Sequence, residues 1–190
     1  DALAHYGFTA DKPTVLVVGG SLGTRTLNEM MKRWILSLDA EPEVQVIWQT
    51  GKYYEREMQE FFLAHPVEGV WQGAFIERMD YAYEMADVVV SRSGACTVSE
   101  LCLVGKPTLF VPSPNVAEDH QTKNAMALVD KDAAVMVRDA DAVEQGMPKA
   151  LGMRADSARL AQLKHNITRL GIGDAAERVV RQIEKEWCKF

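Results

Sequence analysis

The chain has 190 residues, of which 47% are hydrophobic and 25% are charged, and this size and balance predict one globular domain with a sizeable core. The 21 basic and 27 acidic residues give a net charge of −6, without a basic block that could neutralise a run of phosphates. We therefore expect no nucleic-acid partner. Because the apolar stretches are too short to span a bilayer and the amino end has no signal-peptide pattern, we expect no transmembrane segment and only peripheral membrane association.

The three cysteines, Cys96, Cys102 and Cys188, are odd in number and lack the spacing of a zinc site or a disulfide framework. A reducing, cytoplasmic setting is therefore expected. Residues 1–13 do not begin with methionine and have the polar character of a linker that leads into a strand. We expect this linker to connect residues 14–190 to another part of a longer protein.

Short β-rich apolar runs recur along the chain, and segments of helical length or character separate them. The predicted strands are residues 14–18, 44–49, 67–72, 87–91, 108–111 and 134–137. The predicted helices are residues 27–38, 53–64, 79–85, 98–104, 121–130, 142–151, 157–169 and 175–187. This alternation predicts an α/β fold with a Rossmann-like, doubly wound parallel sheet. Ligands of such folds bind at the carboxyl ends of the strands, which places the candidate site in loops 19–23, 73–78, 91–97 and 112–121.

The glycine loop, residues 19–23, follows the first strand and precedes a helix. Its small residues, including Gly20 and Ser21, would let backbone N–H groups approach a phosphate near a helix N-terminus. A tight turn that needs a positive φ is the alternative. The spacing is not G-x-G-x-x-G, Gln49 and Thr50 stand where a dinucleotide site needs an acidic residue, and no G-x-x-x-x-G-K-[ST] pattern occurs. A nicotinamide or ATP site is therefore disfavoured.

The second loop, residues 91–97, again places small residues at a helix N-terminus and predicts a second anion cradle. Its candidate binding residues are Arg92, Ser93, Gly94, Ala95, Cys96 and Thr97. Thr97-Val98-Ser99-Glu100 also matches a capping box, in which Glu100 would bond back to the Thr97 N–H. The functional alternative is that Glu100 accepts hydrogen bonds from ribose hydroxyls.

Motifs along most of the chain resemble the C-terminal, donor-binding domain of the MurG family of bacterial glycosyltransferases. They are Gly19-Gly20-Ser21-Leu22-Gly23, Phe75-Ile76, residues 86–95, Thr97-Val98-Ser99-Glu100, Gly105-Lys106-Pro107, Val111-Pro112, Asp119-His120-Gln121, Asn124-Ala125 and residues 174–179. The resemblance implies one lobe of a GT-B fold, with the N-terminal acceptor lobe outside this chain. It also implies a hexosyltransferase of peptidoglycan synthesis that moves N-acetylglucosamine, with inversion and without a metal or other cofactor, from UDP-N-acetylglucosamine. The acceptor would be the undecaprenyl-pyrophosphoryl muramyl-pentapeptide, lipid I, at the inner face of the cell membrane, and the product would be lipid II.

The resemblance implies roles for individual positions as well. The residue matching Ile76, which follows the expected binding residue Phe75, contacts uracil through its backbone, and the one matching Glu100 holds the ribose hydroxyls. The residues matching Ser21 and residues 94–97 face the diphosphate.

At the sugar, the residue matching Gln121 reaches the hydroxyls, and His120 stands where some family members have a second glutamine. His120 beside Asp119 is also a candidate general base, with an ordinary loop histidine as the alternative. The acceptor-side motif that carries the family's proposed base has no counterpart here. We therefore expect no catalytic residue in this chain, which would not transfer sugar alone.

Two further patterns have competing interpretations. Asp139-Ala140-Asp141 spells the D-x-D pattern that binds manganese in other glycosyltransferases, but we interpret it as a helix start, because helix N-termini could carry the leaving-group charge. The apolar residues Val179, Val180, Ile183 and Trp187 of the last helix either pack on this domain or form an exposed stripe.

Two other functions also stay open: a nucleotide-sugar epimerase, and a separate UDP-sugar-binding subunit of a two-chain transferase.

Overall fold

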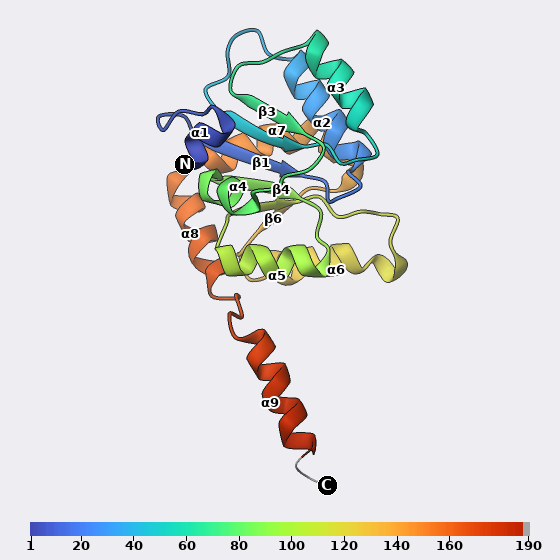
Figure 1. Cartoon of the computed structure of the whole chain (residues 1–190), viewed down its shortest axis with the longest axis vertical. Helices are drawn as coiled ribbons and strands as arrows, with labels where there is room; N and C mark the ends of the chain where they lie inside the picture. Colours follow the sequence, from blue (N-terminus) through green and yellow to red (C-terminus); the bar gives the residue numbers. More distant parts are fainter. Residues whose placement is uncertain (188–190) are drawn as a thin grey trace.

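A six-stranded parallel sheet lies at the centre of the structure, a computed structural model that describes residues 1–187 (Figure 1). The strands are β1 (Thr14–Val18), β2 (Gln45–Gln49), β3 (Val70–Gly73), β4 (Val88–Ser91), β5 (Thr108–Phe110) and β6 (Val135–Met136). Their order across the sheet is β3-β2-β1-β4-β5-β6, so the strand order reverses between β1 and β4. Ligands of open parallel sheets bind at such a reversal. The predicted doubly wound parallel sheet is confirmed. Of the three cysteines, Cys188 lies outside the residues that the structure describes.

Helices cover both faces of this sheet, except for the last helix, which stands apart (Figure 1). They are α1 (Ala2–Tyr6), α2 (Arg25–Leu36), α3 (Glu55–Ala64), α4 (Met79–Met85), α5 (Ala95–Val104), α6 (His120–Val129), α7 (Asp139–Ala155), α8 (Ser157–Thr168) and α9 (Ala175–Trp187), with a 3-10 turn at Ala117–Asp119. Val15 and Val17 of β1 join the apolar layer with α2, α3 and α7, whereas Leu16 joins the layer with α4, α5 and α6. Successive strand residues point to opposite faces, and burial on both faces explains the near-continuous apolar runs.

Residues 1–13 differ from the expected polar linker, because part of this segment folds onto the domain. Ala2 and Tyr6 of α1 are buried, as is Phe8 just beyond it. The Tyr6 ring meets the Trp71 ring edge-on, with centroids 5.3 Å apart, and α1 lies against α4. Burial of two aromatic rings stabilises this arrangement.

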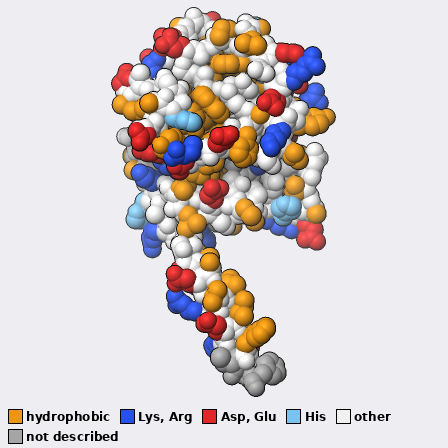
Figure 2. All heavy atoms as spheres, in the orientation of Figure 1, with side chains coloured by type: hydrophobic (Ala, Val, Ile, Leu, Met, Phe, Trp, Pro, Cys, Tyr) orange, Lys and Arg blue, Asp and Glu red, His pale blue; other side chains and the backbone are white. Residues whose placement is uncertain are grey.

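Helix α9 stands away from the rest of the domain, and none of its residues is buried (Figure 1). Its hydrophobic side chains gather along one side, including Val179, Val180 and Ile183, which are each more than half exposed (Figure 2). Of the two interpretations of this helix, the structure shows the exposed stripe. Across residues 1–187, no helix combines the length and the apolar character that crossing a bilayer requires.

Candidate functional site

A crevice of about 560 Å³ opens at the carboxyl edge of the sheet, where the strand order reverses. Its walls include Gly20 of the glycine loop, Arg92, Gly94 and Thr97 of the second loop, and Gln121 at the start of α6. A larger hollow of about 700 Å³ lies between α2 and α7, but charged helical side chains line much of it and no strand-end loop reaches it. The crevice at the strand ends is therefore the candidate site.

Backbone contacts hold the glycine loop in place and leave no room for a side chain at Gly23. Gly20 and Gly23 have φ values of 83° and 86°, and the Gly23 N–H donates to the Gly20 carbonyl over 2.9 Å. A Cβ on Gly23 would overlap the carbonyl oxygen of Thr50 in the next loop. The loop is thus a tight positive-φ turn that also lines the crevice, so the two interpretations of its glycines are compatible. Ser21 is exposed beside the crevice rather than in its wall.

The N-terminus of α2 follows this loop directly. Thr24 is the N-cap residue, but its hydroxyl donates to the Gly19 carbonyl over 2.9 Å and does not cap the helix. The first N–H groups of α2 therefore have no side-chain acceptor, and Thr24, Arg25 and Thr26 all line the crevice. Unsatisfied N–H groups and the positive end of the helix dipole favour an anion there.

Helix α5 begins earlier than predicted, and the predicted capping box is wrong. Gly94 is the N-cap residue and accepts the Val98 N–H over 2.9 Å, so Thr97 lies in the first turn and Glu100 lies beyond it. No side chain caps α5. The Ser93 hydroxyl, just before the helix, instead donates to the Gln121 carbonyl over 2.8 Å. The first N–H groups of α5 thus also have no side-chain acceptor, and Gly94 and Thr97 line the same crevice, so this helix start favours an anion as well.

Glu100 is exposed on α5 and bonds to Tyr83 of α4 rather than to its own helix end. Burial is the main cause that raises the pKa of the Tyr83 hydroxyl, and the Glu100 charge and hydrogen bond add to it. Tyr83 therefore stays neutral and donates to the carboxylate. The capping interpretation of Glu100 is therefore wrong, and ribose binding by Glu100 stays a prediction.

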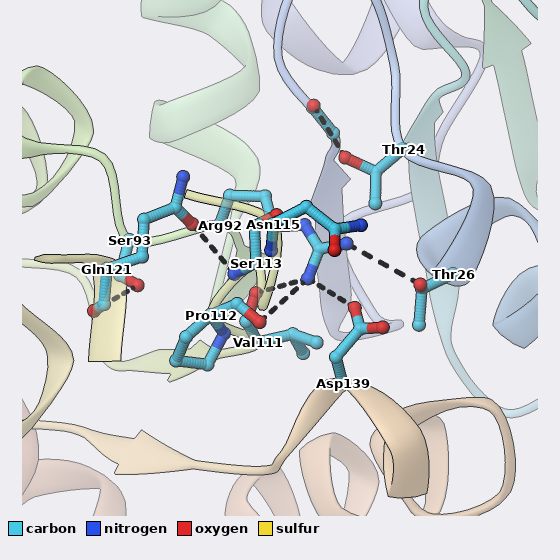
Figure 3. Close-up of polar contacts among 11 residues, drawn as sticks. Thr24, Thr26, Arg92, Ser93, Val111, Pro112, Ser113, Asn115, Gln121 and Asp139 are labelled. Atoms are coloured by element: carbon cyan, nitrogen blue, oxygen red, sulfur yellow. Dashed lines mark hydrogen bonds and ion pairs between the residues drawn. The ribbon is translucent and has the colours of Figure 1, made fainter. Parts of the chain in front are cut away.

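Arg92 forms a junction at the wall of the crevice (Figure 3). Its guanidinium donates to the carbonyls of Val111 and Pro112 over 2.8 and 3.0 Å and pairs with Asp139 of α7 at 2.5 Å. A longer contact of 3.5 Å reaches the Thr26 hydroxyl in α2. Arg92 therefore joins three elements while it lines the crevice, and its predicted contact with a ligand stays a prediction.

Ser93 and Gln121 link the second loop to α6 (Figure 3). Ser93 is fully buried, and its carbonyl accepts a hydrogen bond from the Asn124 side-chain amide over 3.0 Å. Ser93 therefore supports the site without being exposed to a ligand. The Gln121 amide oxygen accepts the Ser113 N–H over 2.9 Å. Within residues 1–187 the Gln121 amide nitrogen has no hydrogen-bond partner, which leaves its two N–H donors available to a ligand.

His120 is exposed, and its Nδ1 donates to the Ala117 carbonyl over 2.8 Å. It does not line the crevice. These observations match the interpretation as a hydrogen-bonded loop histidine, because the described bond of its ring is to a main-chain carbonyl.

The two predicted binding residues of the β3–α4 loop, residues 74–78, differ in their exposure. Phe75 is 53% exposed, with the Lys52 ammonium 5.6 Å from its ring centroid. Ile76 is only 4% exposed because its side chain belongs to the core. Any contact from Ile76 to a ligand must therefore use its main chain.

A family profile described as the glycosyltransferase family 28 C-terminal domain matches residues 14–179. The chain belongs to this family. A relative from Parabacteroides distasonis is 52% identical over 185 residues, and one from Porphyromonas gingivalis is 47% identical over 190 residues. Both carry the name UDP-N-acetylglucosamine--N-acetylmuramyl-(pentapeptide) pyrophosphoryl-undecaprenol N-acetylglucosamine transferase. The matches cover 97% of this chain but only about half the length of these relatives.

Solved structures of other proteins share the fold of this domain. A crystal structure of Acinetobacter baumannii MurG matches with a TM-score of 0.79 and 30% identity, over 93% of this chain and 53% of that one. The fold is therefore one Rossmann-like lobe of a GT-B glycosyltransferase, as predicted. A UDP-N-acetylglucosamine 2-epimerase structure from Listeria monocytogenes matches with a TM-score of 0.72 but only 12% identity, over 98% of this chain and 47% of that one. That match shows a shared fold alone, and the epimerase alternative is not favoured.

The D-x-D carboxylates of the family 28 domain have arginine partners. Asp139 pairs with Arg92, and Asp141 accepts from Arg138 Nε over 2.8 Å. Both lie in the first turn of α7, as the interpretation of a helix start predicts. Among residues 1–187, no cluster of three His, Cys, Asp or Glu side chains is placed to hold a metal ion.

Several crevice residues were not among the individually predicted binding residues. Tyr54 comes from the loop after β2, and Ser113, Pro114 and Asn115 come from the loop after β5. The second group lies in a loop assigned to the candidate face, so its position was predictable but its individual contacts were not. No motif marked Tyr54, which reaches the crevice only because the loop after β2 folds against the glycine loop.

Proposed function

We propose that this domain binds UDP-N-acetylglucosamine and is the donor half of an inverting N-acetylglucosaminyltransferase that converts lipid I to lipid II. The observation that carries the proposal is that two helices without side-chain caps, α2 and α5, begin at one crevice. Two such N-termini suit the two phosphates of a nucleoside diphosphate. The names of relatives up to 52% identical support the choice of sugar nucleotide and acceptor.

The proposed reaction breaks the bond between the anomeric carbon and the diphosphate. The acceptor hydroxyl attacks that carbon from the opposite face, which forms a β-1,4 link, and UDP leaves with the bonding electron pair. The hydroxyl proton passes to a base outside this chain. Negative charge grows on the leaving diphosphate, and each well-placed N–H donor there can contribute about 3–4 kcal/mol. The starts of α2 and α5 supply such donors without a metal.

The other contacts use groups that can form further hydrogen bonds. The free amide N–H groups of Gln121 would donate to sugar hydroxyls, and the Glu100 carboxylate would accept from the ribose. The main chain of Ile76 would meet the uracil edge, beside Phe75. Gly94 and the N–H groups of Ala95, Cys96 and Thr97 would face the diphosphate.

The remaining partners belong to the whole transferase. The lipid-linked muramyl-pentapeptide would bind mainly outside this chain, which spans about half the length of its relatives. We place the enzyme in the cytoplasm, as a peripheral protein at the inner face of the cell membrane. The domain alone would bind donor without transferring sugar.

Calorimetric titration of the 190-residue chain tests the proposal. UDP and UDP-N-acetylglucosamine should bind, UDP-glucose should bind more weakly than UDP-N-acetylglucosamine, and GDP should give no saturable heat. Addition of EDTA should leave the affinities unchanged, because helix N-termini rather than a metal would hold the diphosphate. Equal binding of UDP and GDP by the folded chain would overturn the assignment of the base.

A further inference from the structure

Gln49 is the last residue of β2, the strand that lies between β1 and β3, and only 4% of it is exposed. Its side chain reaches the loops that follow both neighbouring strands. The amide oxygen accepts the Gly19 N–H over 3.0 Å, and the amide nitrogen donates to the Gly20 carbonyl over 2.7 Å. The same nitrogen donates to the Ala74 carbonyl over 3.0 Å. One buried side chain thus joins the glycine loop to the β3–α4 loop.

The pattern of these bonds requires an amide. Both N–H donors of Gln49 point to main-chain carbonyls, and its oxygen receives a main-chain N–H. A glutamate at the same position would keep the acceptor but lose both donors, and its carboxylate would face two carbonyl oxygens. This is the strand end at which a dinucleotide site needs an acid. Here the side chain turns inward, onto the loops themselves.

We propose that Gln49 is a positioning residue, which sets the spacing between the glycine loop and the β3–α4 loop so that one nucleotide can contact both. The inference rests on the proposed function, in which the start of α2, just after the glycine loop, receives the diphosphate and the Ile76 main chain receives the base. Gln49 touches neither part of the nucleotide. Its effect on affinity comes from preorganisation, since a ligand that spans two loops binds more tightly when their separation is already correct.

The main chain after Gln49 supports the same arrangement. The Gly51 N–H donates to the Ala74 carbonyl over 3.1 Å, and the Lys52 N–H donates to the Ser21 carbonyl over 3.2 Å. Residues 50–53 therefore keep the two loops close even when the amide is changed. Replacement of Gln49 is expected to loosen the spacing between the loops without unfolding the domain.

Gln45 provides a matched control at the opposite end of the same strand. It is 2% exposed, and its amide also bonds to main-chain groups: it accepts the Thr9 N–H over 2.7 Å and donates to the carbonyls of Thr9 and Lys12 over 3.0 and 3.1 Å. Gln45→Glu therefore removes the same chemistry from the same strand, but at the amino edge of the sheet. A loss of stability without a role in the site should be similar in Gln45→Glu and Gln49→Glu.

The test compares UDP, uridine and pyrophosphate as ligands of the wild-type chain, Gln49→Glu and Gln45→Glu, with NMR titration for the weak fragments. Loss of two hydrogen bonds should weaken UDP binding by Gln49→Glu about tenfold or more. Uridine and pyrophosphate should each change less than about threefold, because each fragment meets one loop and does not depend on their spacing. Gln45→Glu should bind all three ligands as the wild-type chain does.

The pH dependence separates positioning from a general loss of structure. Burial raises the pKa of the carboxyl group that Gln49→Glu introduces, and the protonated form of that group regains one O–H donor. The ratio of the UDP dissociation constants of Gln49→Glu and Gln45→Glu should therefore fall as the pH is lowered from about 8 to about 5.5. Equal weakening of UDP, uridine and pyrophosphate, or UDP binding by Gln49→Glu as tight as by Gln45→Glu, would overturn the inference. Absence of UDP binding by the wild-type chain would instead overturn the proposed function, and this inference with it.

Discussion

The guanidinium of Arg92 and the carboxylate of Asp139 lie 2.5 Å apart and join the loop after β4 to the first turn of α7. Both side chains are mostly buried, with 16% and 23% exposed. The nearby pair of Arg138 and Asp141 is similar in chemistry, but the Arg138 side chain is 80% exposed. These two pairs allow the effect of burial to be measured within one helix turn.

Asp139→Asn should destabilise the fold by about 2–3 kcal/mol, because it leaves a partly buried guanidinium without its charged partner. Asp141→Asn, as the control, should change the free energy of unfolding by less than about 1 kcal/mol, since its partner is in water. Urea denaturation of both variants measures the difference. Equal effects of the two changes would show that the Arg92 pair does not stabilise the junction.

Gly23→Ala should be more damaging than Gly20→Ala, although both glycines have a positive φ. A Cβ at Gly20 meets open space, so the change costs only the backbone strain of about 1–2 kcal/mol. A Cβ at Gly23 overlaps the Thr50 main chain as well, and the two loops must separate. We expect Gly23→Ala to lose at least about 3 kcal/mol of stability, with strain and overpacking combined. Thermal unfolding would contradict this expectation if the two melting temperatures fell equally.

Glu100→Ala should weaken UDP binding by about 1.5–3 kcal/mol, the range for hydrogen bonds to a charged group, with little change in stability. The reason is that Glu100 caps no helix end and is exposed. Glu60→Ala is a suitable control, because Glu60 is an exposed helical carboxylate that also has one described partner, Arg56, at 2.9 Å. Calorimetry should find wild-type affinity for Glu60→Ala. An unchanged affinity in both variants would remove Glu100 from the proposed site.

Because of the Tyr83 hydroxyl, we expect the folded domain to lose stability in alkaline solution. Its pKa is raised from the ordinary value of 10.0 by burial and by Glu100. The folded state therefore holds its proton where the unfolded state releases it, so this stabilisation is complete below about pH 10 and declines as the pH rises above that value. Tyr83→Phe should flatten this part of the stability curve in urea titrations from pH 8 to 11, whereas Tyr53→Phe, at an exposed ring, should leave it unaltered. A Tyr83→Phe curve that is parallel to that of the wild-type chain would refute the coupling.

Local sequence determined most of the elements and their order. Apolar runs with strand or helix periodicity marked every strand of the sheet and helices α2 to α9, and the last helix has the predicted bounds of residues 175–187. The turn at Gly20 and Gly23 was also legible, because small residues between a strand and a helix favour a positive φ. These features depend on neighbouring residues, so one sequence is sufficient to predict them.

Contacts between distant segments decided the rest. The loop before α5 is tied to α6 by the Ser93 hydroxyl, which donates to the Gln121 carbonyl, 28 positions along the chain. Arg92 was predicted as a binding residue, and only the fold shows that it also pairs with Asp139, 47 positions along the chain. Gln49 carried no positive signal, since only the sheet order places it between the two loops that it joins. A side chain's hydrogen-bond partners depend on which strands are neighbours, and that is a property of the assembled sheet rather than of any local pattern.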